Sequence, residues 1–232
     1  MIKEALAKVV SEDLADIWSI LTPDEKRRVT DAFTIRDFKK NQLIYAEGEE
    51  PEYLWCLLDG KAKLYKEGIG GRSQILRLIR PVQYFGYRAY FAEEPYVSSA
   101  AAIEPSKLGA LPMELVIEMM RENNDIAMFF IKELSRNLGG SDTRIVNLTQ
   151  KHIRGRLAEA LIALKENYGY EDDNSTLRIF MAREDLANLS NMTTSNAIRT
   201  LSCFVSEKMI TVDGRRIRIL NEAALRKISK FG

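Results

Sequence analysis

The chain has 232 residues, of which 46% are hydrophobic and 29% charged, and its formal net charge is +1 at pH 7. This composition excludes a disordered or collagen-like chain, and the length allows one large domain or two small ones. No apolar run approaches the ~18 residues that a membrane helix needs. Residues 1–14 have the mixed charge of an amphipathic helix rather than the apolar core of a signal peptide. We therefore expect a cytoplasmic protein.

The charge is unevenly distributed along the chain. Residues 1–150 carry 20 Lys and Arg against 23 Asp and Glu, whereas residues 151–232 carry 14 against 10, so the two parts have net charges of −3 and +4. A basic C-terminal part fits a nucleic-acid partner, and an unevenly charged solvated surface is the alternative. The two cysteines, Cys56 and Cys203, lie far apart in apolar contexts, which favours reduced thiols.

Residues 38–111 have the texture of short strands. Turn signals every 8–12 residues predict an all-β sandwich or barrel. The pair Asp59-Gly60 is expected to form a turn between two of these strands. The glycine-rich run at residues 68–71 could cradle a phosphate or form a hairpin turn. No helix start with Lys-Ser/Thr follows it, so the hairpin turn is favoured.

After Pro112 the pattern becomes that of one long helix. Mainly apolar residues recur along it in alternating steps of four and three, as at the a and d positions of a heptad. These residues are Ala127, Ile131, Leu134, Leu138, Ser141, Ile145, Leu148 and His152. Such a narrow seam is typical of a coiled coil, and the alternative is burial against the β region. The seam predicts a homodimer with Ala127, Ile131, Leu134, Leu138, Ile145 and Leu148 at the interface. Gly139-Gly140 interrupts it, and each interior glycine costs ~1 kcal/mol relative to alanine.

From Lys151 an amphipathic helix with Ile153, Leu157, Leu161 and Leu164 on one face is expected, followed by a short strand at residues 177–180. A two-turn helix at residues 183–189 should then end near Asn191. Thr193 suits the N-cap of a second helix. In that helix we expect Ala197, Ile198, Leu201 and Val205 to face the core and Thr194, Ser195, Arg199 and Ser202 to face solvent. These helices predict a helix-turn-helix whose second helix enters the major groove of DNA.

The segment "ITVDGRRIRIL" predicts a two-stranded wing with a type I′ turn at Asp213-Gly214. Its arginines, Arg215, Arg216 and Arg218, are expected near phosphates, and Arg199 is expected to reach guanine O6 and N7. The predicted DNA-binding residues are Arg183, Thr193, Thr194, Ser195, Asn196, Arg199, Ser202, Arg215 and Arg216.

The order of these parts resembles the bacterial Crp/Fnr family of transcription regulators. The segments "GEEPEYLWCLLDGKAKLY", "ENNDIAMFFIKELSRNL" and "GRLAEALIAL" are similar to the family's strand pair, to the start of its dimer helix and to its post-hinge helix. The resemblance implies an α+β fold with a β-roll sensor at residues 1–113, a dimerisation helix at 114–150 and a winged helix-turn-helix at 151–232. It also implies an effector-responsive homodimer that binds palindromic promoter sites and recruits RNA polymerase.

Two segments depart from the cyclic-AMP-responsive members of this family, residues 85–91 ("FGYRAYF") and residues 97–100 ("VSSA"). Tyr87 stands where a ribose-binding glutamate is expected, and Val97 or Ser98 stands where a phosphate-binding arginine is expected. A buried phosphate without its guanidinium partner is costly, so cyclic AMP is not the expected effector. The resemblance places the site of an unknown small effector at Gly86, Tyr87, Arg88, Ala89, Ser98, Ser99, Ala100, Ser141 and Asp142.

Arg88 could bind an anion, although a salt bridge to a nearby glutamate is favoured. On the second helix of the helix-turn-helix, Thr194-Ser195 stands where many relatives have Arg-Glu, so a different operator is expected.

Two cysteines exclude a four-cysteine iron–sulfur cluster. His152, the only histidine, falls at the hinge, so we expect neither haem nor a metal site. No nucleophile is paired with a base, so we expect no enzyme. The alternative function is a regulatory subunit whose winged helix binds protein.

Overall fold

The computed structural model describes residues 15–231. The amphipathic helix expected at residues 1–14 lies outside this range. The chain divides into two compact units. The first consists of the chain up to Lys66 together with Arg77–Gly139, and the second consists of Glu67–Leu76 together with the chain from Gly140 on. Each unit is described by itself.

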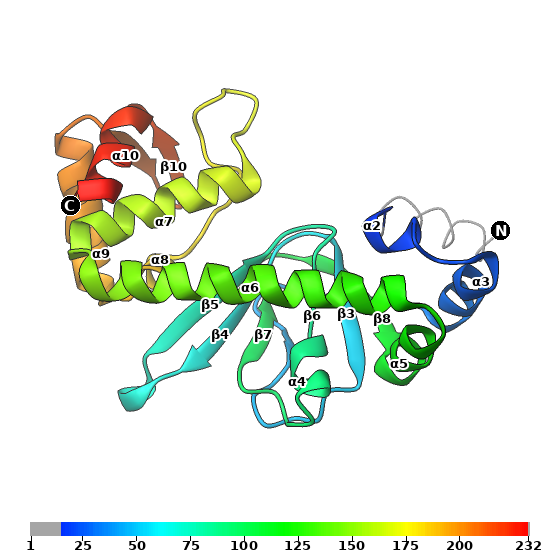
Figure 1. The fold of residues 1–232 in the computed structure, drawn as a ribbon. Coiled ribbons are helices and arrows are strands. Elements are labelled where there is room, and N and C mark those ends of the chain that lie inside the picture. Colours follow the sequence, from blue (N-terminus) through cyan, green and yellow to red (C-terminus); the bar gives the residue numbers. More distant parts are fainter. Residues whose placement is uncertain (1–14, 232) are drawn as a thin grey trace. The chain divides into compact units, whose positions relative to one another are not determined.

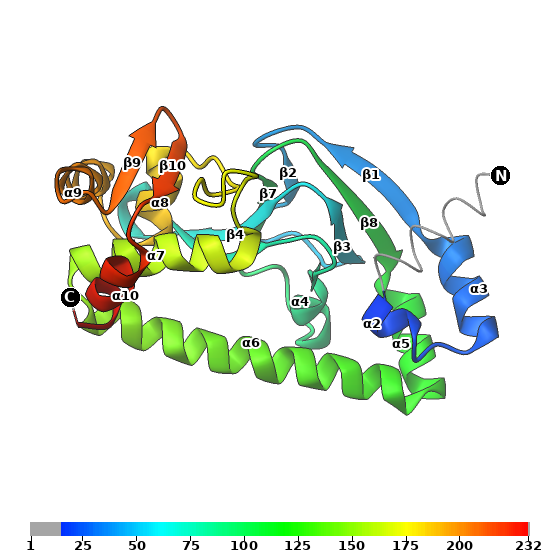
Figure 2. The ribbon, with the colours of Figure 1, turned by 90° about the horizontal axis from the view of Figure 1, so that it is seen from above.

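In the described part of the chain, eight strands form two four-stranded sheets with the orders β1-β8-β3-β6 and β2-β7-β4-β5. β8 pairs antiparallel with both β1 and β3, and β7 pairs antiparallel with both β2 and β4. Figure 1 labels β3, β4, β7 and β8, and Figure 2 also labels β1 and β2. The two sheets confirm the expected β-rich N-terminal region. The strands are β1 (Thr34–Phe38), β2 (Leu43–Tyr45), β3 (Tyr53–Asp59), β4 (Ala62–Glu67), β5 (Ser73–Ile79), β6 (Tyr84–Phe85), β7 (Ser99–Ala102) and β8 (Ser106–Pro112).

The two glycine-containing turns behave differently. Asp59-Gly60 lies at the expected turn between β3 and β4, and this turn connects two different sheets rather than two strands of a hairpin. Gly60 has a φ of 89° there, and a Cβ at this position would collide with Ser106 Oγ and the Pro105 carbonyl, so the turn requires glycine. The run at residues 68–71 does form a hairpin turn, since β4 and β5 are neighbours joined through the 3₁₀ turn Ile69–Gly71.

The core of the first unit consists of two groups of buried side chains. One, which includes Trp55, Phe85 and Leu108, fills the space enclosed by the strands. The other, which includes Val29, Met119 and Phe130, lies under the helices α2 (Ala15–Trp18), α3 (Pro23–Ala32) and α5 (Met113–Glu122). Fully burying one such side chain stabilises the fold by about 1.5–3 kcal/mol.

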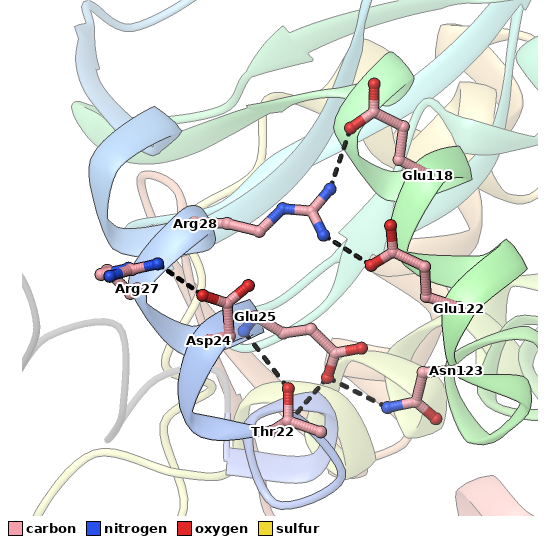
Figure 3. Close-up of polar contacts among 8 residues, drawn as sticks. All are labelled: Thr22, Asp24, Glu25, Arg27, Arg28, Glu118, Glu122 and Asn123. Carbon is pink, nitrogen blue, oxygen red and sulfur yellow. Dashed lines mark hydrogen bonds and ion pairs between the residues drawn. The ribbon is translucent and has the colours of Figure 1, made fainter.

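A set of polar contacts joins α3 to the end of α5 (Figure 3). The Thr22 side chain caps α3, and the Glu25 carboxylate completes a capping box by accepting from the Thr22 backbone N–H at 2.7 Å. The same Glu25 carboxylate accepts a bond of 3.1 Å from Asn123 Nδ2. Arg28 donates to Glu118 at 2.9 Å and to Glu122 at 2.6 Å. These bonds hold α3 beside the point where α6 begins.

The helical pattern after Pro112 is two helices, α5 and α6 (Asn124–Gln150), rather than one. Asn123 separates them, with an extended backbone of φ −133°. Its Oδ1 accepts from the Asp125 backbone N–H at 3.0 Å and so caps the start of α6. His152 lies beyond the end of α6, so the expected seam is wrong at its last position.

The second unit contains α7 (Ile153–Tyr168), α8 (Arg183–Leu189), α9 (Thr194–Ser206), α10 (Glu222–Phe231) and the hairpin of β9 (Ile210–Asp213) with β10 (Arg216–Ile219). The hairpin lies beside α9 (Figure 2). Leu157, Leu161 and Leu164 of α7 are buried as expected. The strand expected at 177–180 is absent, and only isolated bridges of Leu177 with Tyr170 and of Thr176 with Arg218 form. Among the described residues, no helix is long and apolar enough to cross a membrane.

Candidate nucleic-acid interface

The helix-turn-helix is formed by α8 and α9, at the positions that the sequence predicts. Asn191 leaves α8 in the left-handed conformation, with φ 50°, and Met192 beneath it is buried. Thr193 caps α9, because its side chain accepts from the Asn196 backbone N–H at 3.3 Å. These local bonds set the turn between the two helices.

The solvent-facing surface of α9 includes Thr194, Ser195, Arg199 and Ser202, as expected. Arg199 Nη2 donates to Asn196 Oδ1 at 2.6 Å, which leaves the other donors of the guanidinium fork available. The guanidinium is therefore held near the N-terminal half of the helix, where a residue inserted into the major groove meets base edges.

The core-facing stripe of α9 differs from the expectation. Ala197, Leu201 and Phe204 are buried, whereas Ile198 is 49% exposed and Val205 is 40% exposed. The placement of Ile198 and Val205 in the core was wrong. The buried residues recur in steps of four and three around Leu201, and Ile198 and Val205 each lie one residue after a buried position, about 100° around the helix.

The wing forms as an antiparallel hairpin in which Asp213 pairs with Arg216. The two central residues of the turn are therefore Gly214 and Arg215, one position later than expected. Gly214 has a φ of 54°, and Arg215 is not among the residues with positive φ. A type I′ turn needs positive φ at both central residues, so that prediction is wrong.

The wing's arginines have different surroundings. Arg218 Nη2 pairs with Asp173 Oδ2 at 2.9 Å, and Arg216 pairs with Glu171 at 3.4 Å and lies over the ring of Phe180. Bonds from Thr176, and then from Arg218, hold the pKa of Asp173 well below its usual range. Within residues 15–231, Arg215 has no ion-pair partner. Of the three wing arginines, Arg215 is thus the one whose charge no acidic side chain of the described residues neutralises.

Arg183, at the first position of α8, reaches the wing. Its Nη2 donates to the Gly214 carbonyl at 2.5 Å, and burial lowers its pKa. The side chain therefore ties the turn of the wing to the helix-turn-helix. A DNA contact of Arg183 stays a prediction.

Arg144 of α6 contributes an additional contact that the sequence did not suggest. Its Nη2 donates to the carbonyls of Ile75 at 2.7 Å and of Leu189 at 3.0 Å, so α6, β5 and the end of α8 meet at one guanidinium. Nearby, Arg72 donates to Asn191 Oδ1 at 3.1 Å. Burial lowers the pKa of Arg144. A half-buried arginine whose donors reach backbone carbonyls positions those segments.

In the first unit, the effector candidates Gly86–Ala89 form the N-cap and the first three residues of α4 (Tyr87–Phe91). Gly86 has a φ of 91°, and a Cβ there would lie 2.9 Å from Trp55. The Tyr87 ring is buried, which raises its pKa, and Asn137 Nδ2 of α6 donates to its hydroxyl at 3.1 Å. Arg88 pairs with Glu94 at 2.6 Å, the favoured alternative for this residue.

The remaining effector candidates lie in two places. Ser98 and Ser99 are half-buried, Ala100 is buried, and Ser99 Oγ accepts from the Glu47 backbone N–H at 2.9 Å. Ser141 and Asp142 are exposed on α6 and belong to the second unit, whereas the other candidates belong to the first. Binding of an effector by these residues remains a prediction.

The predicted dimer seam on α6 is partly exposed. Ile131, Leu138 and Ile145, spaced by seven residues, are 52%, 66% and 61% exposed. Leu134 instead packs against the core of the first unit, and Ala127 and Leu148 are half-buried. A helix thus shows a regular row of large apolar side chains to solvent.

No group of three or more His, Cys, Asp or Glu side chains in the described part of the chain could hold a metal ion. His152 is exposed at the N-cap of α7. Cys56 is buried, Cys203 is exposed, and neither of the two forms a disulfide.

Comparison with known proteins agrees with this geometry. Residues 35–123 match the family described as cyclic nucleotide-binding domain, and residues 155–228 match the Crp-like helix-turn-helix domain. The chain is 22% identical over 213 residues to the CRP-like cAMP-activated global transcriptional regulator of Mycobacterium tuberculosis, which covers 91% of this chain and 95% of that protein. It is 25% identical over 214 residues to the cyclic AMP receptor protein of Thermus thermophilus, with the same coverage. The solved structure of FixK2 from Bradyrhizobium japonicum is similar with a TM-score of 0.77 and 20% identity, over 84% of this chain and 96% of that one.

Proposed function

Because the chain belongs to the Crp/Fnr family of transcription regulators, we propose that it acts as a homodimer that binds palindromic promoter DNA under the control of a small effector other than cyclic AMP. Residues 1–113 would sense the effector, residues 114–150 would form the dimer, and residues 151–232 would bind DNA. The protein would act in the bacterial cytoplasm, recruit RNA polymerase and catalyse no reaction.

The observation that carries this proposal is the outer surface of α9. It presents Thr194, Ser195 and Arg199 to solvent, beside a wing whose Arg215 has no ion-pair partner in the described residues. Small polar side chains let the helix backbone approach a groove, and a guanidinium can bind guanine through two hydrogen bonds. A cation on the adjacent wing can contact a phosphate.

The proposal is tested by selecting binding sites from a random DNA library with the purified full chain. Selection at low salt strengthens the phosphate contacts and favours recovery of sites in the absence of the effector. The expected result is a two-fold symmetric sequence with half-sites about 10 base pairs apart, centre to centre. A library without enrichment contradicts the proposal and favours the alternative in which the winged helix binds protein.

Cyclic AMP is expected to bind no more tightly than about a millimolar Kd, or ~4 kcal/mol. Tyr87 replaces the expected glutamate, and its hydroxyl is already bonded to Asn137. Neither Val97 nor Ser98 can supply a guanidinium. Isothermal titration calorimetry measures the affinity, with the cAMP-activated relative from Mycobacterium tuberculosis as the positive control. Micromolar binding by this chain would show that the interpretation is wrong.

Replacing Gly139 and Gly140 together by alanine is expected to raise DNA affinity in the absence of effector. Both glycines lie inside the continuous α6, and a Cβ at either would meet no atom within 4 Å in the described chain. The two compact units also divide between them. Two interior glycines weaken a helix by ~2 kcal/mol, so the gain in affinity is at most about 30-fold. We propose that the helix bends here until effector binding straightens it.

Fluorescence anisotropy with a selected operator, without ligand, compares the double alanine variant with the wild type. Thr143→Ala is the matched control, because it raises helix propensity in the same helix without changing a glycine. The control should bind with nearly wild-type affinity. Unchanged or weaker binding by the double variant contradicts the hinge, and weaker dimerisation would instead indicate close approach of a partner helix at the glycines.

A further inference from the structure

The outer surface of α9 contains an apolar side chain, Ile198, within its first two turns. Ile198 is 49% exposed, and its neighbours on this surface, Thr194, Ser195, Arg199 and Ser202, are polar and exposed. With about 100° of rotation per residue, Ile198 lies one turn after Thr194 and one turn before Ser202. An isoleucine thus stands in the middle of the proposed reading surface.

Neither helix stability nor core packing accounts for this isoleucine. A β-branched residue forms helices less readily than alanine does, so α9 would be at least as stable with alanine at this position. The core contacts of the helix come from Ala197, Leu201 and Phe204, which are buried. A single exposed apolar residue is common on protein surfaces, so its meaning depends on what the surrounding surface contacts.

Base edges in the major groove present mainly hydrogen-bonding groups, and the C5 methyl of thymine is the apolar group among them. We infer that Ile198 packs on a thymine methyl in each half-site and so selects thymine at that position. This inference rests on the proposed DNA binding by α9. Consecutive Cα atoms are 3.8 Å apart and successive base pairs are about 3.4 Å apart, so the thymine should lie within one or two steps of the guanine that Arg199 contacts.

The test uses the operator that the wild-type protein selects from random DNA. Each thymine of one half-site is replaced in turn by deoxyuridine, which lacks only the C5 methyl, and affinity is measured by fluorescence anisotropy. Removing contact with one methyl-sized group should weaken wild-type binding about fourfold at one thymine. Ile198→Ala should bind the original operator more weakly and should lose the sensitivity to deoxyuridine at that same thymine.

Val205→Ala is the matched control. Val205 is also a β-branched residue, 40% exposed, and it lies two turns further along the same side of α9. Seven residues correspond to about 10 Å along the helix axis, which takes Val205 away from the base edges near the N-terminus of α9. This variant should keep wild-type affinity and the full sensitivity to deoxyuridine.

Two results would overturn the inference while leaving DNA binding intact. In one, the selected half-site contains no thymine whose methyl affects affinity. In the other, Ile198→Ala remains as sensitive to deoxyuridine as the wild type. Absence of any selected operator is a different result, because it contradicts the proposed function itself and the inference falls with it.

Discussion

Replacing Leu138 by aspartate is expected to make the protein monomeric at micromolar concentration and to abolish tight operator binding. Leu138 is 66% exposed, midway between Ile131 and Ile145 in the row on α6 that we propose as the dimer seam. In a parallel dimer the two aspartates would face each other across the two-fold axis. Burying an unpaired charge there costs several kcal/mol, which exceeds what the neighbouring apolar contacts can compensate.

Sedimentation velocity measures the mass of the variant, and Ile145→Asp should behave in the same way. Arg136→Asp is the matched control on the same helix. Arg136 occupies the position of the heptad furthest from the seam, and its side chain is 72% exposed. Its ion pair with Glu133 lies at the surface and contributes ~0–1 kcal/mol, so this variant should remain a dimer. A fully dimeric Leu138→Asp protein would falsify the seam.

Replacing Arg199 by alanine is expected to cost about 1–3 kcal/mol on the cognate operator and to relax specificity at one base pair. The side chain is exposed and its bond to Asn196 is at the surface, so the fold should be unaffected. Anisotropy on the selected operator and on its single-base variants measures both effects. Equal losses on every sequence would indicate that Arg199 contacts phosphate rather than a base.

Arg215→Ala and Arg218→Ala test the wing arginines, which are expected to lie near phosphates, whereas Arg199 is expected to contact a base. Arg215 has no ion-pair partner among residues 15–231, so its loss should weaken binding to all DNA nearly equally and lower the slope of log affinity against log salt by about one unit. Arg218 is paired with Asp173, so its replacement should leave that slope unchanged. A change of slope with Arg218→Ala would show that the ion pair opens on DNA.

The helix-turn-helix could be predicted residue by residue because its signals are local. A threonine N-cap acts within one turn, and an asparagine can end a helix through its own backbone conformation. The bounds of α8 and the cap at Thr193 therefore agree with the prediction. The division of the strands between two sheets could not be predicted in the same way. β8 pairs with β1 and β3, and nothing within a strand identifies a partner so far away along the chain.

The tertiary structure also changed the interpretation of individual side chains in the candidate site. Hydrophobic periodicity assigned Ile198 and Val205 to the core, although Phe204 is buried in place of Val205. Arg218 and Arg183, whose DNA contacts stay predictions, also have partners within the chain: Arg218 pairs with Asp173, and Arg183 donates to the carbonyl of Gly214. Neither contact has a sequence signal, because both partners come from other segments of the chain.

The sequence by itself determined the order of the parts, the capped helices of the DNA-binding region and the apolar row on α6, since these depend on the spacing and conformational preferences of nearby residues. Only the tertiary structure decided which arginine charges are compensated, which side of α9 is buried and how Tyr87 is bonded to Asn137. The physical reason is that hydrophobicity and charge belong to a residue, whereas burial and pairing depend on which distant segments pack against it.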